Sequence, residues 1–208
     1  MDALTTTSYA ILGWLDVRPW STYELAHQMR RNLRFFWPRV ESRLYAEPKN
    51  LVEHGLARAE QTFVGRRART TYAITDAGRQ ALAEWLAKPS REPSLWFEAL
   101  VRVFFAGSGT REDLINALRS IPAFADEIQT AGTFVASQYL EGTYPFPERA
   151  HLSGLVFDFL WHYADHLRSW AERSLEEVDG WSDVDPTGKQ QRAFDVFTRA
   201  LAAKGESG

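Results

Sequence analysis

The chain contains no cysteine. Disulfide bonds, thiolate zinc sites and cysteine nucleophiles are therefore excluded together, and the composition fits a reducing compartment. No apolar run approaches the roughly 18 residues that a membrane-spanning helix needs. Residues 1–5 lack the positively charged start of a signal peptide. We expect a cytoplasmic protein without a membrane partner.

The net charge of −3 is small, but it is unevenly distributed along the 208 residues. Residues 1–88 hold 13 Lys and Arg against 9 Asp and Glu, whereas residues 89–208 hold 11 against 18. A basic front half and an acidic back half indicate two parts with different partners, and the basic part favours nucleic acid. With 45% apolar and 25% charged residues, the composition is that of an ordinary globular protein.

Two helices are predicted at the start of the chain. The first spans residues 7–15 and ends before Pro19. Its inner face would be formed by apolar residues at helical spacing, namely Ala10, Ile11, Leu12 and Leu15. Ser21 and Glu24 have the spacing of a capping box, so we expect the second helix to begin at Ser21.

A third helix is expected over about residues 41–54, because Gly55 offers a left-handed stop directly after it. Its inner face would consist of Leu44, Pro48, Leu51 and Val52. The apolar period then changes, and residues 58–64 and 70–75 are typical of the two strands of a hairpin around the loop 65–69. A fourth helix follows and reaches Lys88.

The best domain boundary is the short polar stretch 88–93, which two prolines interrupt. Beyond it the pattern is helical throughout, with helices expected over about 94–106, from Thr110 onward, over 148–178 and over 189–202. The long helix carries a broad apolar stripe of Leu152, Leu155, Val156, Phe159, Leu160, Tyr163, Leu167 and Trp170. A stripe this wide in so small a domain favours burial against a second copy of the chain, so we expect a homodimer.

Three helices, a hairpin and a fourth helix are the order of a winged helix-turn-helix. We therefore predict a mostly α protein with a small β-hairpin: an amino-terminal winged helix-turn-helix DNA-binding domain over residues 1–88, and a carboxy-terminal all-α dimerisation and effector domain over residues 89–208. The outward face of the third helix suits a major groove, because Arg or Lys pairs with guanine and Asn with adenine. The candidate DNA-binding residues on this helix are Ser42, Arg43, Lys49 and Asn50, and Arg39 adds positive charge at its entry. At the hairpin tip, Arg66, Arg67 and Arg69 are expected to meet phosphates or an adjacent minor groove.

Several ordered motifs in the first 88 residues resemble the PadR family of transcriptional regulators; they lie at 10–15, 21–25, 44–45, 49–56 and 72–79. The acidic helical remainder is similar to the longer carboxy-terminal dimerisation domain of one PadR subgroup. The resemblance implies a homodimeric bacterial repressor that reads a palindromic operator in double-stranded DNA and is released by a small molecule. It also implies that Tyr23 and Tyr45 lie near the DNA and that the three hairpin arginines form a basic wing.

The sequence departs from the family pattern at one point. The family places a proline directly after the Leu-Tyr pair, whereas here Ala46 and Glu47 precede Pro48. A proline at this position cannot donate a hydrogen bond to the Leu44 carbonyl. The recognition helix is therefore either bent at Pro48 or begins its regular part there, where proline is tolerated.

Other signals in the sequence are weaker. His162 and His166 lie one turn apart with Asp158 a turn earlier, but no fourth metal ligand is identifiable. Residues 107–110 are glycine-rich without the Gly-Lys-Ser/Thr of a phosphate loop, and no catalytic triad context occurs. We expect neither an enzyme nor a bound cofactor or metal.

A small aromatic effector is expected from three tryptophans on segments near the predicted junction of the two domains: Trp14, Trp96 and Trp161. An aromatic pocket there would suit a planar, mostly apolar molecule, although tryptophans also commonly fill a core. Two other functions stay open at this point. One is a winged-helix module that binds protein, and the other is a helical ligand- or metal-responsive protein that uses the winged half as a scaffold.

Overall fold

The computed structural model of the chain describes residues 4–38, 44–64, 67–185 and 187–205. The chain divides into two compact units, Met1–Pro93 and Ser94–Gly208. The division falls after Pro93, a few residues beyond the boundary expected after Lys88. Each unit has its own arrangement of helices, and only the first contains a sheet among the described residues.

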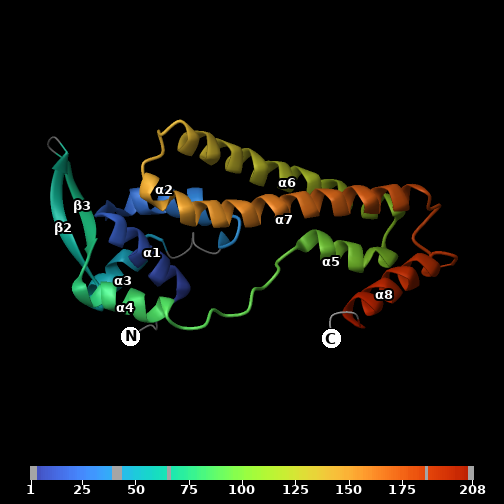
Figure 1. Ribbon diagram of the computed structural model, residues 1–208, viewed down its shortest axis with the longest axis horizontal. Coiled ribbons are helices and arrows are strands. Elements are labelled where there is room, and N and C mark those ends of the chain that lie inside the picture. Colours follow the sequence, from blue (N-terminus) through green and yellow to red (C-terminus); the bar gives the residue numbers. More distant parts are fainter. Residues whose placement is uncertain (1–3, 39–43, 65–66, 186, 206–208) are drawn as a thin grey trace. The chain divides into compact units, whose positions relative to one another are not determined.

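Among the described residues, the first unit contains four α-helices and three strands (Figure 1). In chain order these are α1 (Thr6–Val17), β1 (Trp20–Ser21), α2 (Thr22–Leu33), α3 (Glu47–Glu53), β2 (Ala57–Val64), β3 (Arg67–Ile74) and α4 (Asp76–Leu86). The strands are antiparallel in the order β1-β3-β2. The expected order of three helices, hairpin and helix is confirmed, and the two-residue strand β1 is an addition that sequence reasoning missed.

The two amino-terminal helices begin where local capping dictates. Thr5 caps α1 through the Ser8 N–H, and Ser21 caps α2 through the Glu24 N–H. In α2 the Glu24 carboxylate returns the interaction to the Ser21 N–H at 2.9 Å, which completes the predicted capping box. The predicted start of the second helix is therefore confirmed.

The core of the first unit lies where α1 contacts α3, α4 and the sheet. Its members are almost fully buried apolar side chains from every layer: Ile11, Leu12, Leu15, Trp20, Leu25, Met29, Leu44, Leu51, Tyr72 and Ile74. On the side of α4, the ring of Tyr9 stacks on Trp85 with 5.0 Å between centroids. Of the inner face predicted for the first helix, Ile11, Leu12 and Leu15 are buried, whereas Ala10 is half-buried.

The third helix is much shorter than expected. Residues 44–46 form a turn, and α3 begins only at Glu47, with Pro48 in its first two positions. Residues 41–43, where the sequence suggested that the helix starts, lie outside the described residues. Pro48 therefore lies in the first turn of the helix and does not bend it, because a proline there removes no intrahelical hydrogen bond.

The hairpin is longer and its tip shorter than predicted. The β2–β3 register runs from Ala57 opposite Ile74 to Val64 opposite Arg67, so Arg67 and Arg69 belong to a strand and not to a loop. The β-branched and aromatic side chains that follow Arg69 favour extended backbone in the inner part of β3, and the ladder continues beyond them to Arg67. Figure 1 shows the two strands continuing past the helices of the first unit.

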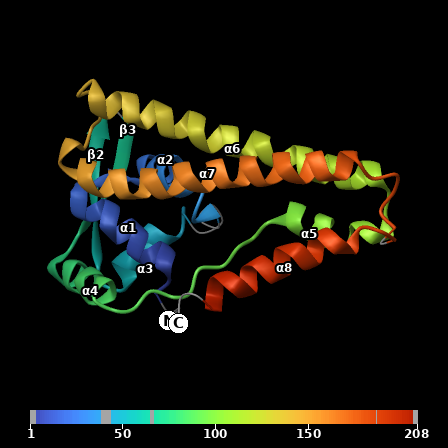
Figure 2. The same cartoon turned by 45° about the vertical axis from the view of Figure 1, so that its right-hand side comes forward.

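The second unit is helical. It contains α5 (Glu98–Phe104), the short 3₁₀ turns η2 (Ala106–Ser108) and η3 (Pro147–Arg149), and the helices α6 (Arg111–Leu140), α7 (Ala150–Asp179) and α8 (Gln190–Gly205). Helices α6 and α7 lie side by side and antiparallel in both views (Figures 1 and 2). The expected helix over 94–106 begins only at Glu98, and residues 89–97 adopt no regular structure.

The α6–α7 pair is held by an apolar seam and by polar contacts along it. Leu118, Ile121 and Ala125 on α6 and Ala164 and Ala171 on α7 are almost completely buried; the alanines allow two long helices to approach closely. Arg168 reaches from α7 to Asp126 and to Gln129 of α6. Within the described ranges, no helix is long and apolar enough to cross a membrane.

Replacing two helical glycines by alanine should change the stability of the protein in opposite directions. A Cβ at Gly78 in α4 would collide with the carbonyl oxygen of Leu56 and with Ile74, whereas a Cβ at Gly13 in α1 meets no described atom within 4 Å. Gly78→Ala should therefore lower the free energy of unfolding by about 2–3 kcal/mol, and Gly13→Ala should raise it by about 0.5–1 kcal/mol. Urea denaturation of both variants measures the signs, and equal effects would contradict the close packing of α4 on the turn before β2.

Candidate nucleic-acid interface

Helix α3 is anchored by one face and exposed on the other. Pro48 and Leu51 are buried together with Leu44 from the preceding turn, while Lys49 is exposed and Asn50 is half-buried. Seven residues make barely two turns, so this helix depends on its packing rather than on its own propensity. The buried face of α3 therefore fixes the position of the side chains on its outward face.

Two tyrosines of the first unit have most of their side chains in solvent. Tyr45, in the turn before α3, is 59% exposed, and Tyr23, in the first turn of α2, is 71% exposed. Arg39, Ser42, Arg43 and Arg66 lie outside the described residues, as does the side chain of Arg67.

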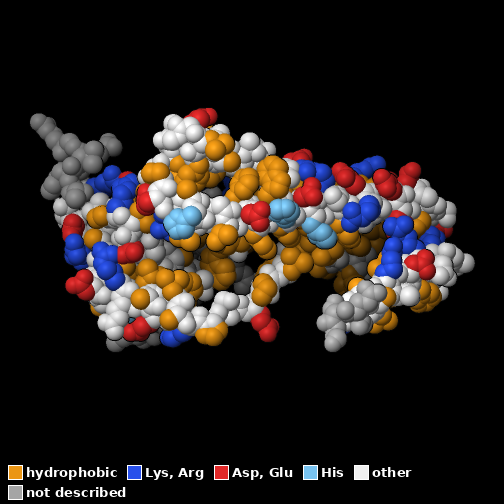
Figure 3. Space-filling model, in the orientation of Figure 1, with side chains coloured by type: hydrophobic (Ala, Val, Ile, Leu, Met, Phe, Trp, Pro, Cys, Tyr) orange, Lys and Arg blue, Asp and Glu red, His pale blue; other side chains and the backbone are white. Residues whose placement is uncertain are grey.

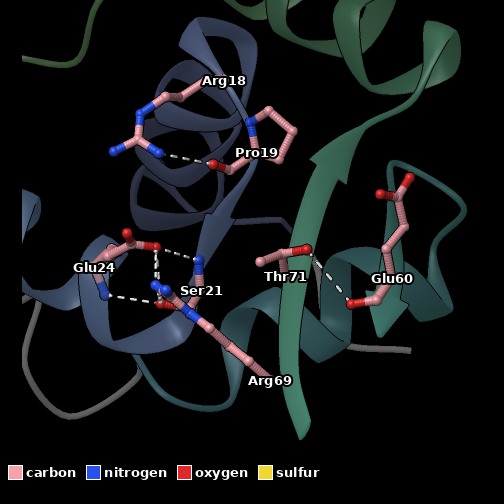
Figure 4. Close-up of polar contacts among 7 residues, drawn as sticks. All are labelled: Arg18, Pro19, Ser21, Glu24, Glu60, Arg69 and Thr71. Carbon is pink, nitrogen blue, oxygen red and sulfur yellow. Dashed lines mark hydrogen bonds and ion pairs between the residues drawn. The ribbon is translucent and has the colours of Figure 1, made fainter. Parts of the chain in front are cut away.

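Arg69 is engaged within the protein. From β3 its guanidinium donates to the Ser21 hydroxyl at 2.7 Å and forms an ion pair with the Glu24 carboxylate, which joins the hairpin to the beginning of α2 (Figure 4). The sequence suggested a loop residue at the tip that meets phosphates. The structure places Arg69 five residues from the hairpin's inner end, on a strand and beside an acidic partner.

The same contacts change the acidity of Glu24. Partial burial raises the pKa of this carboxyl, but hydrogen bonds from the Ser21 backbone and hydroxyl, together with Arg69, outweigh burial and leave the pKa below its ordinary value. The charged form is therefore the form that the fold stabilises.

Glu47 is a buried acid that sequence reasoning did not single out. It is only 5% exposed, and its Oε1 accepts hydrogen bonds from the Ser8 hydroxyl of α1 and, at 3.2 Å, from Asn50 Nδ2. A signal was present: Glu47 lies three residues after Leu44 and four before Leu51, on the inner face of the helix. An acid at such a position needs a partner.

The three candidate effector tryptophans lie in different units. Trp14 belongs to α1 of the first unit, where the ring of Trp20 meets it edge-on at 5.9 Å. Trp96 and Trp161 belong to the second unit, where Trp161 stacks on Phe157 at 5.5 Å and Trp96 is 75% exposed.

The two histidines of α7, His162 and His166, are exposed. His162 lies one turn from Asp158, with 3.4 Å between Nδ1 and the carboxylate. Across the described ranges, no three His, Cys, Asp or Glu side chains are grouped to hold a metal ion.

The fold and the outward face of α3 define the first unit as a winged helix-turn-helix domain. Residues 11–84 match the Transcriptional regulator PadR-like family. These residues therefore resemble a PadR-like domain, as the sequence motifs predicted, and the matched family is one of transcriptional regulators.

Individual relatives extend the likeness beyond this domain. The negative transcriptional regulator PadR of Bacillus subtilis is 27% identical over 138 residues, which are 65% of this chain and 71% of that protein. The structure of B. subtilis PadR in complex with operator DNA superposes with a TM-score of 0.70 at 22% identity, over 84% of this chain and 99% of the other. The structure of the same B. subtilis protein with p-coumaric acid gives a TM-score of 0.63 at 22% identity, over 86% and 100%. The likeness of fold thus includes helices of the second unit.

The lowered pKa of Glu24 predicts an acid-sensitive part of the stability. Because the folded pKa lies below the unfolded value of about 4.3, the contribution is complete above that pH and disappears as the pH falls through the folded pKa. Glu24→Gln keeps the shape of the capping box and should cost about 0.5–1 kcal/mol at pH 7. The difference from wild type should vanish in strong acid when unfolding is followed by circular dichroism. The exposed Glu84→Gln serves as the control, and a pH-independent cost for Glu24→Gln would refute the assignment.

Proposed function

We propose that this chain is a DNA-binding transcriptional repressor that reads an operator as a homodimer. The observation that carries the proposal is the PadR-like winged helix-turn-helix unit, in which buried Leu44 and Leu51 anchor α3. This anchoring leaves Lys49 exposed and Asn50 half-buried. These side chains suit base edges and phosphates of a major groove. The net basic charge of residues 1–88 favours the same partner.

The names of the relatives support the proposal. One is a negative transcriptional regulator, and its structure has been determined with operator DNA. We infer that the DNA-facing set comprises Tyr23, Tyr45, Lys49 and Asn50, with Arg39, Ser42, Arg43, Arg66 and Arg67 as further contacts. Arg69 can contact DNA only if its guanidinium leaves the ion pair with Glu24 and binds a phosphate instead.

Exposed apolar side chains on the second unit support the homodimer (Figure 3). On α7, Leu155 is 71% and Phe159 65% exposed, and α5 adds Phe104. The predicted stripe on α7 therefore divides: Leu167 is buried against α6, and the earlier part is left for another surface. Apolar area of this extent marks interaction sites, and a second copy of the chain is the commonest occupant.

A small planar aromatic molecule is the effector that we propose. Exposed and half-buried aromatic rings on the second unit provide stacking surfaces, and the B. subtilis relative has been determined with p-coumaric acid. A ligand of this kind releases DNA only if it binds the DNA-incompetent dimer more tightly than the competent one.

We place the protein in the bacterial cytoplasm, on the nucleoid when DNA is bound.

Selection of bound fragments from genomic DNA tests the repressor. The enriched motif should have inverted symmetry, with half-site centres about 10 base pairs or a multiple apart, because two identical subunits present α3 to one side of the duplex. Binding to that motif should weaken steeply with salt, at a log–log slope of about −0.9 per neutralised phosphate. Lys49→Ala should reduce this slope by about one for each α3, and Glu84→Gln should leave it unchanged. A motif without inverted symmetry, or retention that does not depend on salt, would contradict the proposal.

Titration with p-coumaric acid, and separately with a planar aromatic cation, tests the effector. The effective compound should change tryptophan fluorescence and release the operator over the same concentration range. Trp161→Phe should weaken both responses, because the ring on α7 is part of the proposed stacking surface, and Trp181→Phe should leave both intact. A fluorescence change without release, or silence in both measurements, would count against an aromatic effector.

A further inference from the structure

A continuous polar chain crosses the otherwise apolar seam between α1 and α3. It runs from the Thr5 N–H, which donates to Ser8 Oγ at 2.8 Å, to the Ser8 hydroxyl, which donates to Glu47 Oε1 at 2.5 Å. Asn50 Nδ2 donates to the same carboxylate oxygen at 3.2 Å. Ser8 is fully buried and Glu47 is 5% exposed, whereas Asn50 is half-buried at the outward side of α3.

Each hydrogen bond in this chain has a fixed direction. A carboxylate only accepts, so both the Ser8 hydroxyl and the Asn50 amide must donate to Glu47. The backbone N–H of Thr5 only donates, so it uses a lone pair of Ser8 Oγ and leaves the Ser8 proton for Glu47. The amide of Asn50 is therefore held with its nitrogen toward the protein.

An acid in this seam requires an explanation, because burying a carboxylate is expensive unless it is hydrogen-bonded, and apolar residues would fill the same space at lower cost. This series of hydrogen bonds ends at Asn50, the residue on the described face of α3 that is best suited to read a base. In an unrestrained asparagine the oxygen and nitrogen exchange places easily, since the amide is nearly symmetric in shape. A fixed nitrogen removes that ambiguity.

We propose that Ser8 and Glu47 are positioning residues for base recognition by Asn50. This inference rests on the proposed DNA-binding function and assigns the base that Asn50 prefers. The amide oxygen is directed outward as an acceptor, so the contacted base must carry an exocyclic amino group in the major groove. Adenine fits best, because its N6 donates to the oxygen while N7 accepts the remaining Nδ2 proton. Neither Ser8 nor Glu47 touches the DNA.

The test measures base discrimination by the full chain on its selected operator. Asn50→Ala first identifies the base pair that Asn50 reads, as the one position where preference falls, by about 5- to 100-fold. The double variant Ser8→Ala/Glu47→Leu should then lose about 3- to 10-fold of the preference at that same base pair, because the amide is free to rotate. The salt slope should stay unchanged, because no phosphate contact is removed.

The double variant separates positioning from structural support. Replacing both polar partners by apolar groups leaves only the half-buried Thr5 N–H without its acceptor. Thermal stability should therefore fall by no more than the loss of this one capping hydrogen bond, while discrimination falls. Thr7→Val is the matched control: its buried hydroxyl lies next to Ser8 on α1 but accepts from Trp37 Nε1 at 3.2 Å, so discrimination should be unchanged. Added to Asn50→Ala, the double change should have no further effect on base preference.

Three results would overturn the inference while leaving the proposed function intact. They are a uniform loss of affinity for all bases in the double variant, effects that add to those of Asn50→Ala, and full discrimination in the double variant. An Asn50→Ala protein without any altered base pair would also overturn it. If wild type itself shows no sequence preference and no salt dependence, the proposed function fails and the inference with it.

Discussion

The packing of α1 against α3 is the contact on which the rest of the first unit depends. Helix α3 has seven residues, too few to persist in water without tertiary support. Leu44 and Leu51 supply that support by being completely buried, and Pro48 lies in the first turn, where no intrahelical hydrogen bond is lost. Everything that the outward face presents to a partner depends on this buried side.

A second group of contacts fastens the hairpin to the helices. Strand β1 pairs with β3 through Trp20 opposite Tyr72 and Ser21 opposite Thr71, and Arg69 adds its bonds to Ser21 and Glu24. Partly exposed ion pairs contribute little free energy by themselves. Here the ion pair acts together with the β1–β3 backbone ladder and the Arg69–Ser21 hydrogen bond, so three chemically different contacts join the hairpin to the start of α2.

The elements that the sequence predicted well are those with local causes. The capping boxes at Ser21 and Thr110 need only a residue three positions away, and both helices begin there. Strand β1 has two residues and no local pattern, because it exists only through its pairing with β3. Its existence required knowledge of the tertiary fold.

Much the same holds for the candidate site. The outward position of Lys49 follows from helical periodicity, which the sequence contains. The partners of Arg69 and of Glu47 do not, since Ser21 and Ser8 lie 48 and 39 residues away along the chain. An arginine near a hairpin tip and an acid beside a proline look like solvated surface until the fold brings their partners to them.

Ser21 lies where all these constraints meet, and this limits how the chain can change during evolution. An inserted or deleted residue between α1 and α2 would shift the β1 register, remove the cap of α2 and misplace the acceptor of Arg69 in one step. Aspartate, the usual replacement for a capping serine, would put a second carboxylate beside Glu24. Length variation among related chains should therefore avoid the junction 18–22 and collect in residues 89–97, where no ladder or cap is broken.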